Sequence, residues 1–244
     1  SAVAIAAALG NGTICDIYTD VDGVYTTDPR VCKNAHKMDT ISYEEMLEMA
    51  SMGAKVLQIR SVEIAEKYNV PVRVRSTFSN DPGTLVTKED NMMESVLVSG
   101  IAFDKDQARV TLCDVQDRPG SAAGIFSKLG NAGIVVDMII QTASRNGVTD
   151  IAFTVSRKDV KRTMDVLQAQ DCGCSKIENS QNIAKISVIG VGMRNHSGVA
   201  SRVFDTLYKA GINVIMISTS EVKISCLINE DDLNLAVNTL HQAF

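Results

Sequence analysis

The second half of the chain contains one pattern of hydrophobic and polar positions twice. Aligning Gly120 with Gly198 gives an offset of 78 positions (198 minus 120). The same offset pairs apolar residues and glycines: Phe126/Phe204, Leu129/Leu207, Ala132/Ala210, Gly133/Gly211, Ile134/Ile212, Val136/Val214 and Met138/Met216. A register kept over this many positions indicates an internal repeat, and therefore two modules of the same fold.

Each copy predicts the same order of elements. A hydrophobic run predicts a first strand, and an amphipathic helix follows a loop. A glycine turn then leads to a second strand, a third strand and a second helix. The first strand, third strand and second helix are expected at 108–115, 149–155 and 158–168 in copy one, and at 183–191, 221–228 and 231–241 in copy two. This βαββαβ order predicts a ferredoxin-like sandwich, in which the helices pack on one face of an antiparallel sheet.

The two copies differ at their ends, and the difference predicts how they are connected. Copy one has strand-forming residues at 174–178 after its second helix, whereas copy two has no segment left after 231–241 to complete its sheet. The run 95–103 (SVLVSGIAF) precedes copy one and has strand composition. Because an unpaired sheet edge is unfavourable, we expect this run to complete copy two, with copy one inserted within it. The expected domains are 1–90, then 107–179 for copy one, and 95–106 with 180–244 for copy two.

The stretch 18–30 (YTDVDGVYTTDPR) has the residue mix of a loop that binds nucleotide phosphates. It follows a short apolar run at 14–17 that predicts a buried strand, and open α/β sheets bind ligands at the carboxyl ends of their strands. Gly23 permits a turn with positive φ, Asp28-Pro29 fixes another turn, and Arg30 offers a planar fork of donors to a phosphate. The alternative is a solvated, turn-rich loop without a ligand.

This loop closely resembles a segment of the aspartate kinases, members of the amino-acid kinase family. The similarity continues through 42–78 (SYEEMLEMASMGAKVLQIRSVEIAEKYNVPVRVRSTF) and 80–86 (NDPGTLV). The resemblance implies a site for ATP, used with Mg²⁺ by the complete enzyme, that is lined here by Thr19, Asp20, Tyr25, Arg30 and Lys55. The chemistry agrees, because Arg30 and Lys55 can neutralise a polyphosphate. For Lys55, the alternative is a solvated charge near a helix end.

The resemblance also implies segments that this sequence does not contain. The family's Lys-Phe-Gly-Gly motif, its Ser/Thr substrate site and its Gly-rich loop with an acidic residue are missing, and 1–12 (SAVAIAAALGNG) is similar to the helix that follows that loop. We therefore expect the chain to begin partway through a kinase domain and to carry no catalytic residue. Phosphoryl transfer depends on groups and metal ions positioned around the phosphate, so this chain alone is expected to be inactive.

Residues 96–244 resemble ACT domains, the small-molecule-sensing modules that follow the catalytic domain in aspartate kinases. The most similar parts are 192–204 (GMRNHSGVASRVF) and 212–228 (INVIMISTSEVKISCLI). The resemblance implies that an amino acid binds at the loop between first strand and first helix, against a neighbouring module. The implied effector-binding positions are Asp117, Arg118, Pro119, Gly120, Ser121, Ala122, Val135, Val136, Asp137, Gln141 and Ser144 in copy one, and Val199, Ala200, Asn213, Val214, Ser220 and Glu221 in copy two.

Asp117 has a specific chemical role in this set. Its carboxylate can bind the ammonium group of an amino acid, while backbone amides after Pro119 can bind the carboxylate. The alternative is that Asp117 and the Pro119-Gly120 turn only start the helix. For Gln141 and Ser144, the alternative is the polar edge of a strand.

Composition and charge exclude several classes of function. The net charge is −5, the isoelectric point is about 5.3, and no Lys/Arg run is present, which argues against nucleic acid or an anionic membrane as a partner. No apolar stretch approaches the roughly 20 residues of a membrane span, and the start lacks a signal-peptide pattern. The six cysteines have no CxxC spacing, which predicts reduced thiols in a cytoplasm. Three histidines far apart indicate no metal site.

The two resemblances together imply the C-terminal part of an aspartate kinase, with the end of its ATP-binding domain and two ACT modules. The parent enzyme would convert ATP and L-aspartate to 4-phospho-L-aspartate, and this part would bind lysine and/or threonine for feedback inhibition. A homodimer is expected through the ACT modules, because pairing covers their sheet edges. The alternative is a non-catalytic regulatory subunit that assembles with a complete kinase chain, with Met92 or Met93 as an internal start. An unrelated enzyme with an ACT sensor is disfavoured by 18–30.

Overall fold

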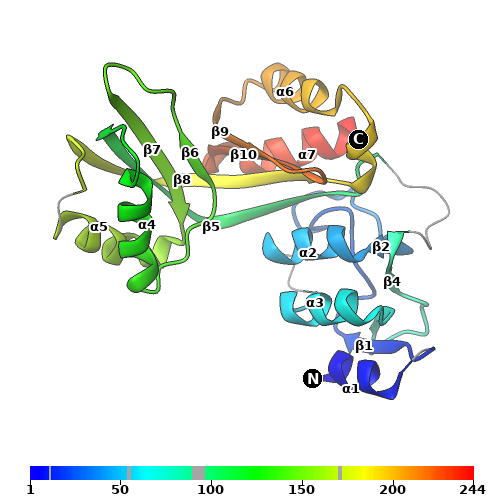
Figure 1. Cartoon of the computed structure of the whole chain (residues 1–244). Helices are drawn as coiled ribbons and strands as arrows, with labels where there is room; N and C mark the ends of the chain where they lie inside the picture. Colours follow the sequence, from blue (N-terminus) through cyan, green and yellow to red (C-terminus); the bar gives the residue numbers. More distant parts are fainter. Residues whose placement is uncertain (11, 54–55, 90–96, 170–171) are drawn as a thin grey trace. The chain divides into compact units, whose positions relative to one another are not determined.

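The described chain forms two compact units. A computed structural model describes residues 1–10, 12–53, 56–89, 97–169 and 172–244 (Figure 1). Unit 1 comprises Ser1–Asp104, Ile186–Cys226 and Asp232–Phe244, and unit 2 comprises Lys105–Lys185 and Leu227–Asp231. In sequence, unit 2 is therefore mainly one continuous segment, and segments of unit 1 precede and follow it.

The N-terminal part of unit 1 is a four-stranded sheet with helices packed on it (Figure 1). The strand order is β1-β3-β4-β2, with parallel pairing in β1/β3 and β2/β4 and antiparallel pairing in β3/β4. The elements are α1 (Ala2–Leu9), β1 (Cys15–Thr19), β2 (Thr40–Ser42), α2 (Tyr43–Ser51), α3 (Ile59–Tyr68), β3 (Val72–Ser76) and β4 (Thr84–Thr87). Aliphatic and methionine side chains such as Met46, Val62 and Val74 form the core between helices and sheet.

Helix α2 begins at a capping box. The Ser42 hydroxyl accepts a hydrogen bond from the Glu45 N–H at 3.2 Å, and the Glu45 carboxylate accepts one from the Ser42 N–H at 3.1 Å. Glu45 is fully buried, and it also accepts bonds from the Ser99 hydroxyl and, at 3.0 Å, from the Val191 N–H. One carboxylate therefore holds the helix start to two distant segments of unit 1.

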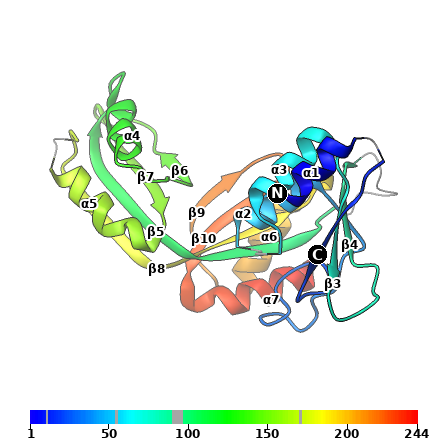
Figure 2. The same cartoon turned by 90° about the horizontal axis from the view of Figure 1, so that it is seen from below.

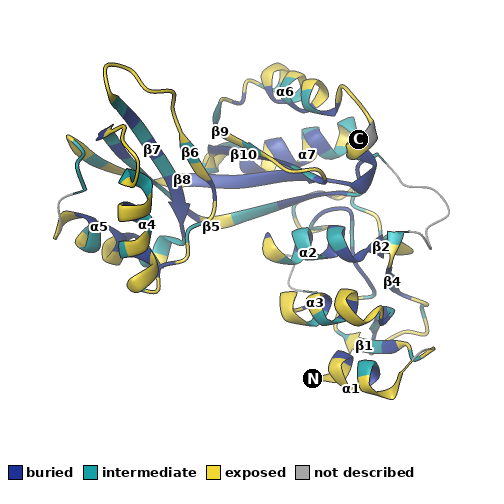
Figure 3. Ribbon diagram, in the orientation of Figure 1, coloured by how far each residue is buried: buried dark blue, intermediate teal, exposed yellow. Residues whose placement is uncertain are grey.

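The C-terminal part of unit 1 contains the helices of copy two. The elements are η3 (Val191–Asn195), α6 (Val199–Lys209), β9 (Val214–Thr219), β10 (Lys223–Asn229), η4 (Glu230–Asp232) and α7 (Leu233–Ala243), of which β10 and η4 include residues of unit 2. The apolar stripes of α6 and α7 are buried, with Val203, Leu207, Val237 and Leu240 at 0 or 1% exposure. Figure 3 shows the opposite faces of both helices exposed.

Unit 2 is the first βαββαβ copy (Figure 2). Its elements are β5 (Gly100–Gln116), α4 (Ser121–Asn131), β6 (Ile139–Gln141), β7 (Val148–Val155), η2 (Arg157–Asp159), α5 (Val160–Gln168) and β8 (Lys176–Ile189), of which β5 and β8 extend beyond the unit. Strand β7 pairs antiparallel with both β5 and β6. Ile125 and Leu129 of α4 and Leu167 of α5 belong to the same core as Phe153 of β7.

The predicted fold class is confirmed, with two differences in strand boundaries. The runs 95–103 and 108–115 were expected as separate strands, but 100–116 form one strand, β5. Two separate strands were likewise expected at 174–178 and 183–191, but 176–189 form one strand, β8. The linking residues contain no glycine or proline that would end a strand. Residues 95 and 96 lie outside the described residues. The Ser99 N–H donates to the Ile189 carbonyl at 2.8 Å, so the segment before copy one pairs with the segment after it.

The backbone φ angles explain why glycines recur at equivalent positions of the two copies. Gly120 and Gly198 are the N-caps of α4 and α6, with φ values of 95° and 99°. Gly133 and Gly211, after these helices, have φ values of 67° and 74°. Side chains other than hydrogen are disfavoured in this left-handed region. Equivalent positions therefore require glycine in both copies.

Candidate functional site

The loop 20–38 begins where β1 ends, as expected for a ligand-binding loop. Thr19 is the last residue of β1, and its hydroxyl donates to the Asp20 carboxylate at 2.9 Å. The Thr19 carbonyl accepts a bond from the Thr77 N–H at 2.9 Å, which ties the loop start to the segment after β3. Thr19 and Asp20 therefore lie together at one edge of the sheet.

Gly23 is needed in this loop for a reason other than the expected one. It is not among the residues with positive φ, so the expectation of a left-handed turn there was wrong. A Cβ atom at Gly23 would lie 2.4 Å from Oγ1 of Thr84. That hydroxyl accepts a bond from the Val24 N–H at 2.8 Å and donates to the Met38 carbonyl at 2.6 Å. The close approach of the Thr84 side chain, rather than φ, explains the glycine.

Tyr25 and Arg30 extend from the loop, and each is paired with an aspartate. The Tyr25 hydroxyl donates to Asp22 at 3.1 Å, and burial together with this carboxylate raises the pKa of Tyr25. The Arg30 side chain is 88% exposed and forks onto Asp28, with Nε–Oδ1 at 3.0 Å and Nη2–Oδ2 at 2.8 Å. Hydrogen bonding to Asp28 raises the pKa of Arg30. Arg30 is therefore an accessible cation whose partner a phosphate could replace.

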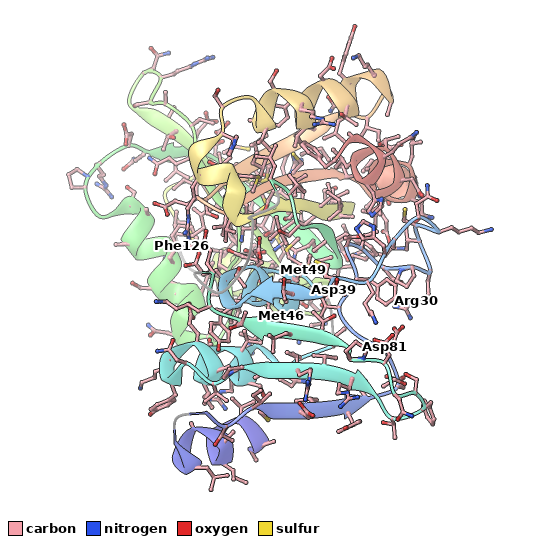
Figure 4. All side chains as sticks on the ribbon, turned by 90° about the vertical axis from the view of Figure 1, so that its right-hand side faces the viewer. Arg30, Asp39, Met46, Met49, Asp81 and Phe126 are labelled. Atoms are coloured by element: carbon pink, nitrogen blue, oxygen red, sulfur yellow. The ribbon has the colours of Figure 1, made fainter. Side chains whose placement is uncertain are left out.

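A second cation in this loop, Lys37, was missed from the sequence. It forms an ion pair with Asp81, on the turn between β3 and β4, and hydrogen bonding to Lys37 lowers the pKa of Asp81. Figure 4 shows Arg30 and Asp81 on the same side of unit 1. A backbone bridge joins Lys37 to Tyr25, which no local sequence pattern reveals. Lys55, the fifth expected nucleotide residue, lies outside the described residues.

In copy one, a cavity of about 680 Å³ lies over the start of α4. It brings together four expected effector residues, Arg118, Pro119, Gly120 and Ser121, with Gln116, Gly124, Ile125, Lys128, Cys172 and Gly173. Lys128 and Cys172 were not anticipated. They approach each other to 3.8 Å between Nζ and Sγ, although the two residues are far apart in sequence.

Asp117 stands beside this cavity and does not cap the helix. The N-cap of α4 is Gly120, and no side chain makes a cap hydrogen bond there. The Pro119-Gly120 turn therefore starts the helix, as the alternative expected, but Asp117 has no part in capping it. The Asp117 N–H donates to the Gly147 carbonyl at 2.9 Å, which fixes the loop to the neighbouring hairpin. Asp117 is exposed, but neither it nor Ala122 is among the described residues that line the cavity.

The remaining copy-one residues surround β6 and do not line this cavity. Val135 is 79% exposed, and Val136 packs partly against the core. Asp137 pairs with Lys185 of β8, a lysine that is only 5% exposed. The sequence contained one indication of this pair, because Lys185 is the single charged residue in the otherwise apolar run 183–189 (IAKISVI).

Gln141 and Ser144 lie close to the third strand. Gln141 ends β6 opposite Ile151 of β7, and Ser144 is exposed next to the Arg145–Val148 bridge. These positions agree with the polar strand edge that was the alternative for them, and they do not by themselves indicate a ligand.

In copy two, a cavity of about 630 Å³ lies at the equivalent place, over the start of α6. The described residues that line it include four expected ones, Val199, Ala200, Ser220 and Glu221, together with Met193, Arg194, His196, Ser197, Gly198, Thr219 and Ile224. Asn213 and Val214, at the start of β9, do not line it.

Arg194 connects the copy-two cavity to the N-terminal part of unit 1. Its guanidinium group pairs with Glu44 of α2, with Glu89 at 3.3 Å and with Glu221 at 3.5 Å. Nearby, Lys223 of β10 pairs with Glu48 of α2 at 2.7 Å. The acidic face of α2 is therefore bound by cations from copy two.

Two further observations limit the kinds of site. In the described ranges, no three His, Cys, Asp or Glu side chains gather as a metal ion would require. Among the described helices, none combines the length and the apolar character of a membrane span.

Comparison with known protein families matches three parts of the chain. Residues 1–76 match the amino acid kinase family, and residues 109–172 and 186–244 each match the ACT domain. An aspartate kinase of Stutzerimonas stutzeri is 53% identical over 99% of this chain, which corresponds to 59% of that protein. The chain thus spans about three fifths of the length of the curated relatives it matches.

Solved structures give the same result. E. coli aspartokinase III in complex with aspartate and ADP is 31% identical and has a TM-score of 0.84, over 100% of this chain and 54% of that one. A crystal structure of aspartokinase alpha and beta subunits is 48% identical with a TM-score of 0.57, and the match covers 60% of this chain and 98% of that one. From the three family matches, these identities and the shared fold, the chain belongs to the aspartate kinases.

Proposed function

We propose that this chain is the regulatory part of an aspartate kinase together with the end of its ATP-binding domain. The parent enzyme would transfer a phosphoryl group from ATP to L-aspartate, giving 4-phospho-L-aspartate. The part described by this chain would bind an end-product amino acid, lysine and/or threonine, and so mediate feedback inhibition. Its own role would be to sense rather than to catalyse.

The observation that carries this proposal is the pair of cavities at equivalent places in the two copies. Each lies where a loop meets the start of a helix, beside a glycine N-cap with left-handed φ. Exposed backbone amides at a helix start favour a carboxylate, and Asp117 beside the copy-one cavity can bind an ammonium group. A free amino acid carries both groups. The proposed effector residues are therefore those named above in both copies, including the ones around β6 and β9 that could face a neighbouring module.

A relative supports the choice of ligand class. E. coli aspartokinase III has also been solved in complex with lysine and aspartate, with 31% identity to this chain and a TM-score of 0.80 over 99% of it. We extend amino-acid binding to this chain because its copies have cavities large enough for such a ligand.

For the nucleotide we propose Thr19, Asp20, Tyr25, Arg30 and Lys55 as contacts. Thr19 and Asp20 carry the hydroxyl and carboxylate that suit a ribose or base edge, and Arg30 presents an exposed fork toward a phosphate. Mg²⁺ would accompany ATP in the complete enzyme. Since no metal cluster is present among the described side chains, we assign it no ligand in this chain.

The test is calorimetric titration of the purified chain with lysine, threonine and methionine, singly and in pairs. Saturable binding of lysine or threonine is expected, and binding of neither would overturn the effector proposal. An assay for 4-phospho-L-aspartate should detect no product from this chain alone, because it lacks the Lys-Phe-Gly-Gly and Gly-rich segments.

The second candidate is a regulatory subunit that assembles with a complete kinase chain. It is favoured by one observation, that 60% of this chain matches nearly all of a chain from the aspartokinase alpha and beta subunits. The internal start proposed for it, Met92 or Met93, lies outside the described residues. Co-purification of the 93–244 segment with a complete kinase chain would support this candidate.

We also propose a homodimer through the ACT modules and a cytoplasmic location. β6 and β9 are the outer strands of the sheet order β6-β7-β5-β8-β10-β9, and paired edges would protect them. The thiols of Cys15, Cys32, Cys113 and Cys226 are free, in agreement with a reducing compartment. A monomer in sedimentation at micromolar concentration, with and without lysine or threonine, would contradict the dimer.

A further inference from the structure

Thr26 lies in the loop that we propose to bind nucleotide, and its hydrogen bonds reach residues outside that loop. It is 8% exposed. Its N–H donates to the His36 carbonyl at 3.0 Å, and its hydroxyl oxygen accepts from the His36 N–H at 3.2 Å. These two bonds close the loop on itself. Thr26 lies next to Tyr25 and four residues before Arg30, so its position determines the backbone from which both side chains extend.

Two other bonds of Thr26 come from copy two. Its carbonyl accepts from the Ile101 N–H on β5 at 2.7 Å. Its hydroxyl oxygen lies 2.8 Å from Nε2 of His241, in the last turn of α7. One turn earlier on α7, the Asn238 side-chain amide donates to the Val31 carbonyl at 3.1 Å. All of these residues belong to unit 1. Helix α7 therefore binds the loop on both sides of Arg30.

We infer that His241 is a positioning residue for this loop: through Thr26, it fixes the backbone that presents Tyr25 and Arg30. The inference rests on the proposed nucleotide-binding function of the loop. The Arg30 side chain is almost fully exposed and pairs with Asp28 of the same loop, so this pair does not tie Arg30 to the rest of the unit. Order in the loop must come largely from its backbone bonds, and preorganised contacts favour affinity because less conformational entropy is lost on binding.

The charged groups around His241 make this contact sensitive to pH. The His36 ring lies edge-on at 5.9 Å between ring centroids, and Arg202 of α6 stacks on the Phe244 ring three residues further on, at 4.7 Å. Burial, and next the neighbouring His36, lower the pKa of His241. The folded junction therefore favours the neutral imidazole. As pH falls below the ordinary histidine value of about 6.5, protonation opposes the packed junction, and the loop should loosen.

The experiment compares four variants of this chain. His241→Ala and Thr26→Val remove the hydrogen bond between Thr26 and His241. His241→Gln keeps a polar group near the position of Nε2 that does not titrate. Thr239→Ala is the control on the same helix. The Thr239 hydroxyl donates to Leu235 and Ala236 carbonyls of α7 itself. Hydrogen exchange of the 24–31 amides, measured without nucleotide at pH 7.5, should increase several-fold in His241→Ala and Thr26→Val only. Circular dichroism verifies that each variant is folded.

A second readout is the Kd for ADP with Mg²⁺, measured at pH 7.5 and pH 6. His241→Ala should weaken binding by about fivefold to tenfold, and the loss of affinity between pH 7.5 and pH 6 should be smaller in His241→Gln than in the wild type. A structural role of His241 elsewhere would not produce this difference in pH dependence. Unchanged 24–31 exchange in both bond-removing variants would overturn the inference. If the wild type binds no ADP, the nucleotide proposal fails, while hydrogen exchange still decides whether His241 fixes the loop.

Discussion

The loops of the two ACT copies share a backbone but differ in charge. Residues 117–120 (DRPG) in copy one align with 195–198 (NHSG) in copy two, and both lead into a helix through a glycine with φ near 100°. In sequence, copy one thus has Asp117 at the position where copy two has Asn195. The repeat preserves the cavity but not its chemistry, so an ammonium-bearing effector should prefer copy one.

The two loops also differ in what holds them. In copy one, the Asp117 N–H bonds to Gly147 and the Ser121 hydroxyl donates to the Gln116 carbonyl at 2.6 Å, all within unit 2. In copy two, Arg194 pairs with Glu44 of α2, in the part of unit 1 that matches the amino acid kinase family. The copy-one loop is therefore held by bonds within its own unit, whereas the copy-two cavity is tied to residues 1–76, the kinase segment.

The largest expected effect comes from one substitution made in each copy. Leu129 and Leu207 occupy the same repeat position on α4 and α6, and they are 0% and 1% exposed. Replacing either by alanine should cost about 2–5 kcal/mol of unfolding free energy in its own unit, because a buried side chain is lost and a cavity remains. Leu207→Ala should destabilise the kinase segment together with copy two, whereas Leu129→Ala should spare it.

The chain offers a direct way to measure this difference. All five tyrosines, at 18, 25, 43, 68 and 208, lie in unit 1, and the chain has no tryptophan. Tyrosine fluorescence therefore reports unfolding of unit 1. A Phe126→Trp background reports unit 2, since the Phe126 ring packs on Phe153 at 5.5 Å between centroids. Equal shifts of both signals in both variants would mean that the two units unfold as one.

The second prediction tests the difference in charge. Asp117→Asn gives copy one the residue of copy two, and effector affinity should fall about tenfold to hundredfold, since a charge-assisted bond is worth about 1.5–3 kcal/mol. The melting temperature without effector should barely change, because Gly120 and not Asp117 caps α4. Titration calorimetry and thermal unfolding of the same preparation measure both. Unchanged affinity would place the effector's ammonium group elsewhere.

The sequence predicted features that depend on local residue type. The glycine positions and apolar spacing gave the repeat and its βαββαβ order, because left-handed turns and amphipathic faces leave regular patterns. It did not predict side-chain pairs that meet across the fold. Asp137 and Lys185 are 48 positions apart and Thr26 and His241 are 215 apart, so only tertiary packing brings them together. Gly23 was identified correctly as a special position, but for the wrong physical reason.

The third prediction tests the difference in anchoring. Arg194→Ala removes a guanidinium group that pairs with three carboxylates, and it should cost unit 1 about 1 kcal/mol, at the upper end for partly exposed ion pairs. Arg118→Ala, in the other cavity, should stay within about 0.5 kcal/mol, as is usual for an exposed residue. Urea unfolding at low and at 0.5 M salt measures both, and salt should reduce the difference. A larger loss of unfolding free energy in Arg118→Ala than in Arg194→Ala would contradict the conclusion that copy two is the copy held by ion pairs.

The smallest effect is expected from a decrease in pH, which should reduce the stability of unit 1 more than that of unit 2. Hydrogen bonds from arginine or lysine lower the pKa of three carboxyls in this unit, Asp16, Asp28 and Asp81. In unit 2 the corresponding carboxyl is Glu178, whose pKa is lowered by a hydrogen bond from Lys176. The side chains of this pair are highly exposed.

The sign follows from proton binding. A carboxyl whose folded pKa lies below its unfolded value of about 4 binds fewer protons when folded, so its contribution is present above pH 4 and is lost as pH falls further. Tyrosine fluorescence should therefore show unit 1 losing more stability than unit 2 between pH 5 and pH 3. Asp16→Asn should reduce that loss, because it removes the carboxylate that accepts two bonds from Arg73, at 2.9 and 3.0 Å. If the tryptophan signal of unit 2 shifts more than the tyrosine signal, the paired carboxyls of the kinase segment do not control the acid response.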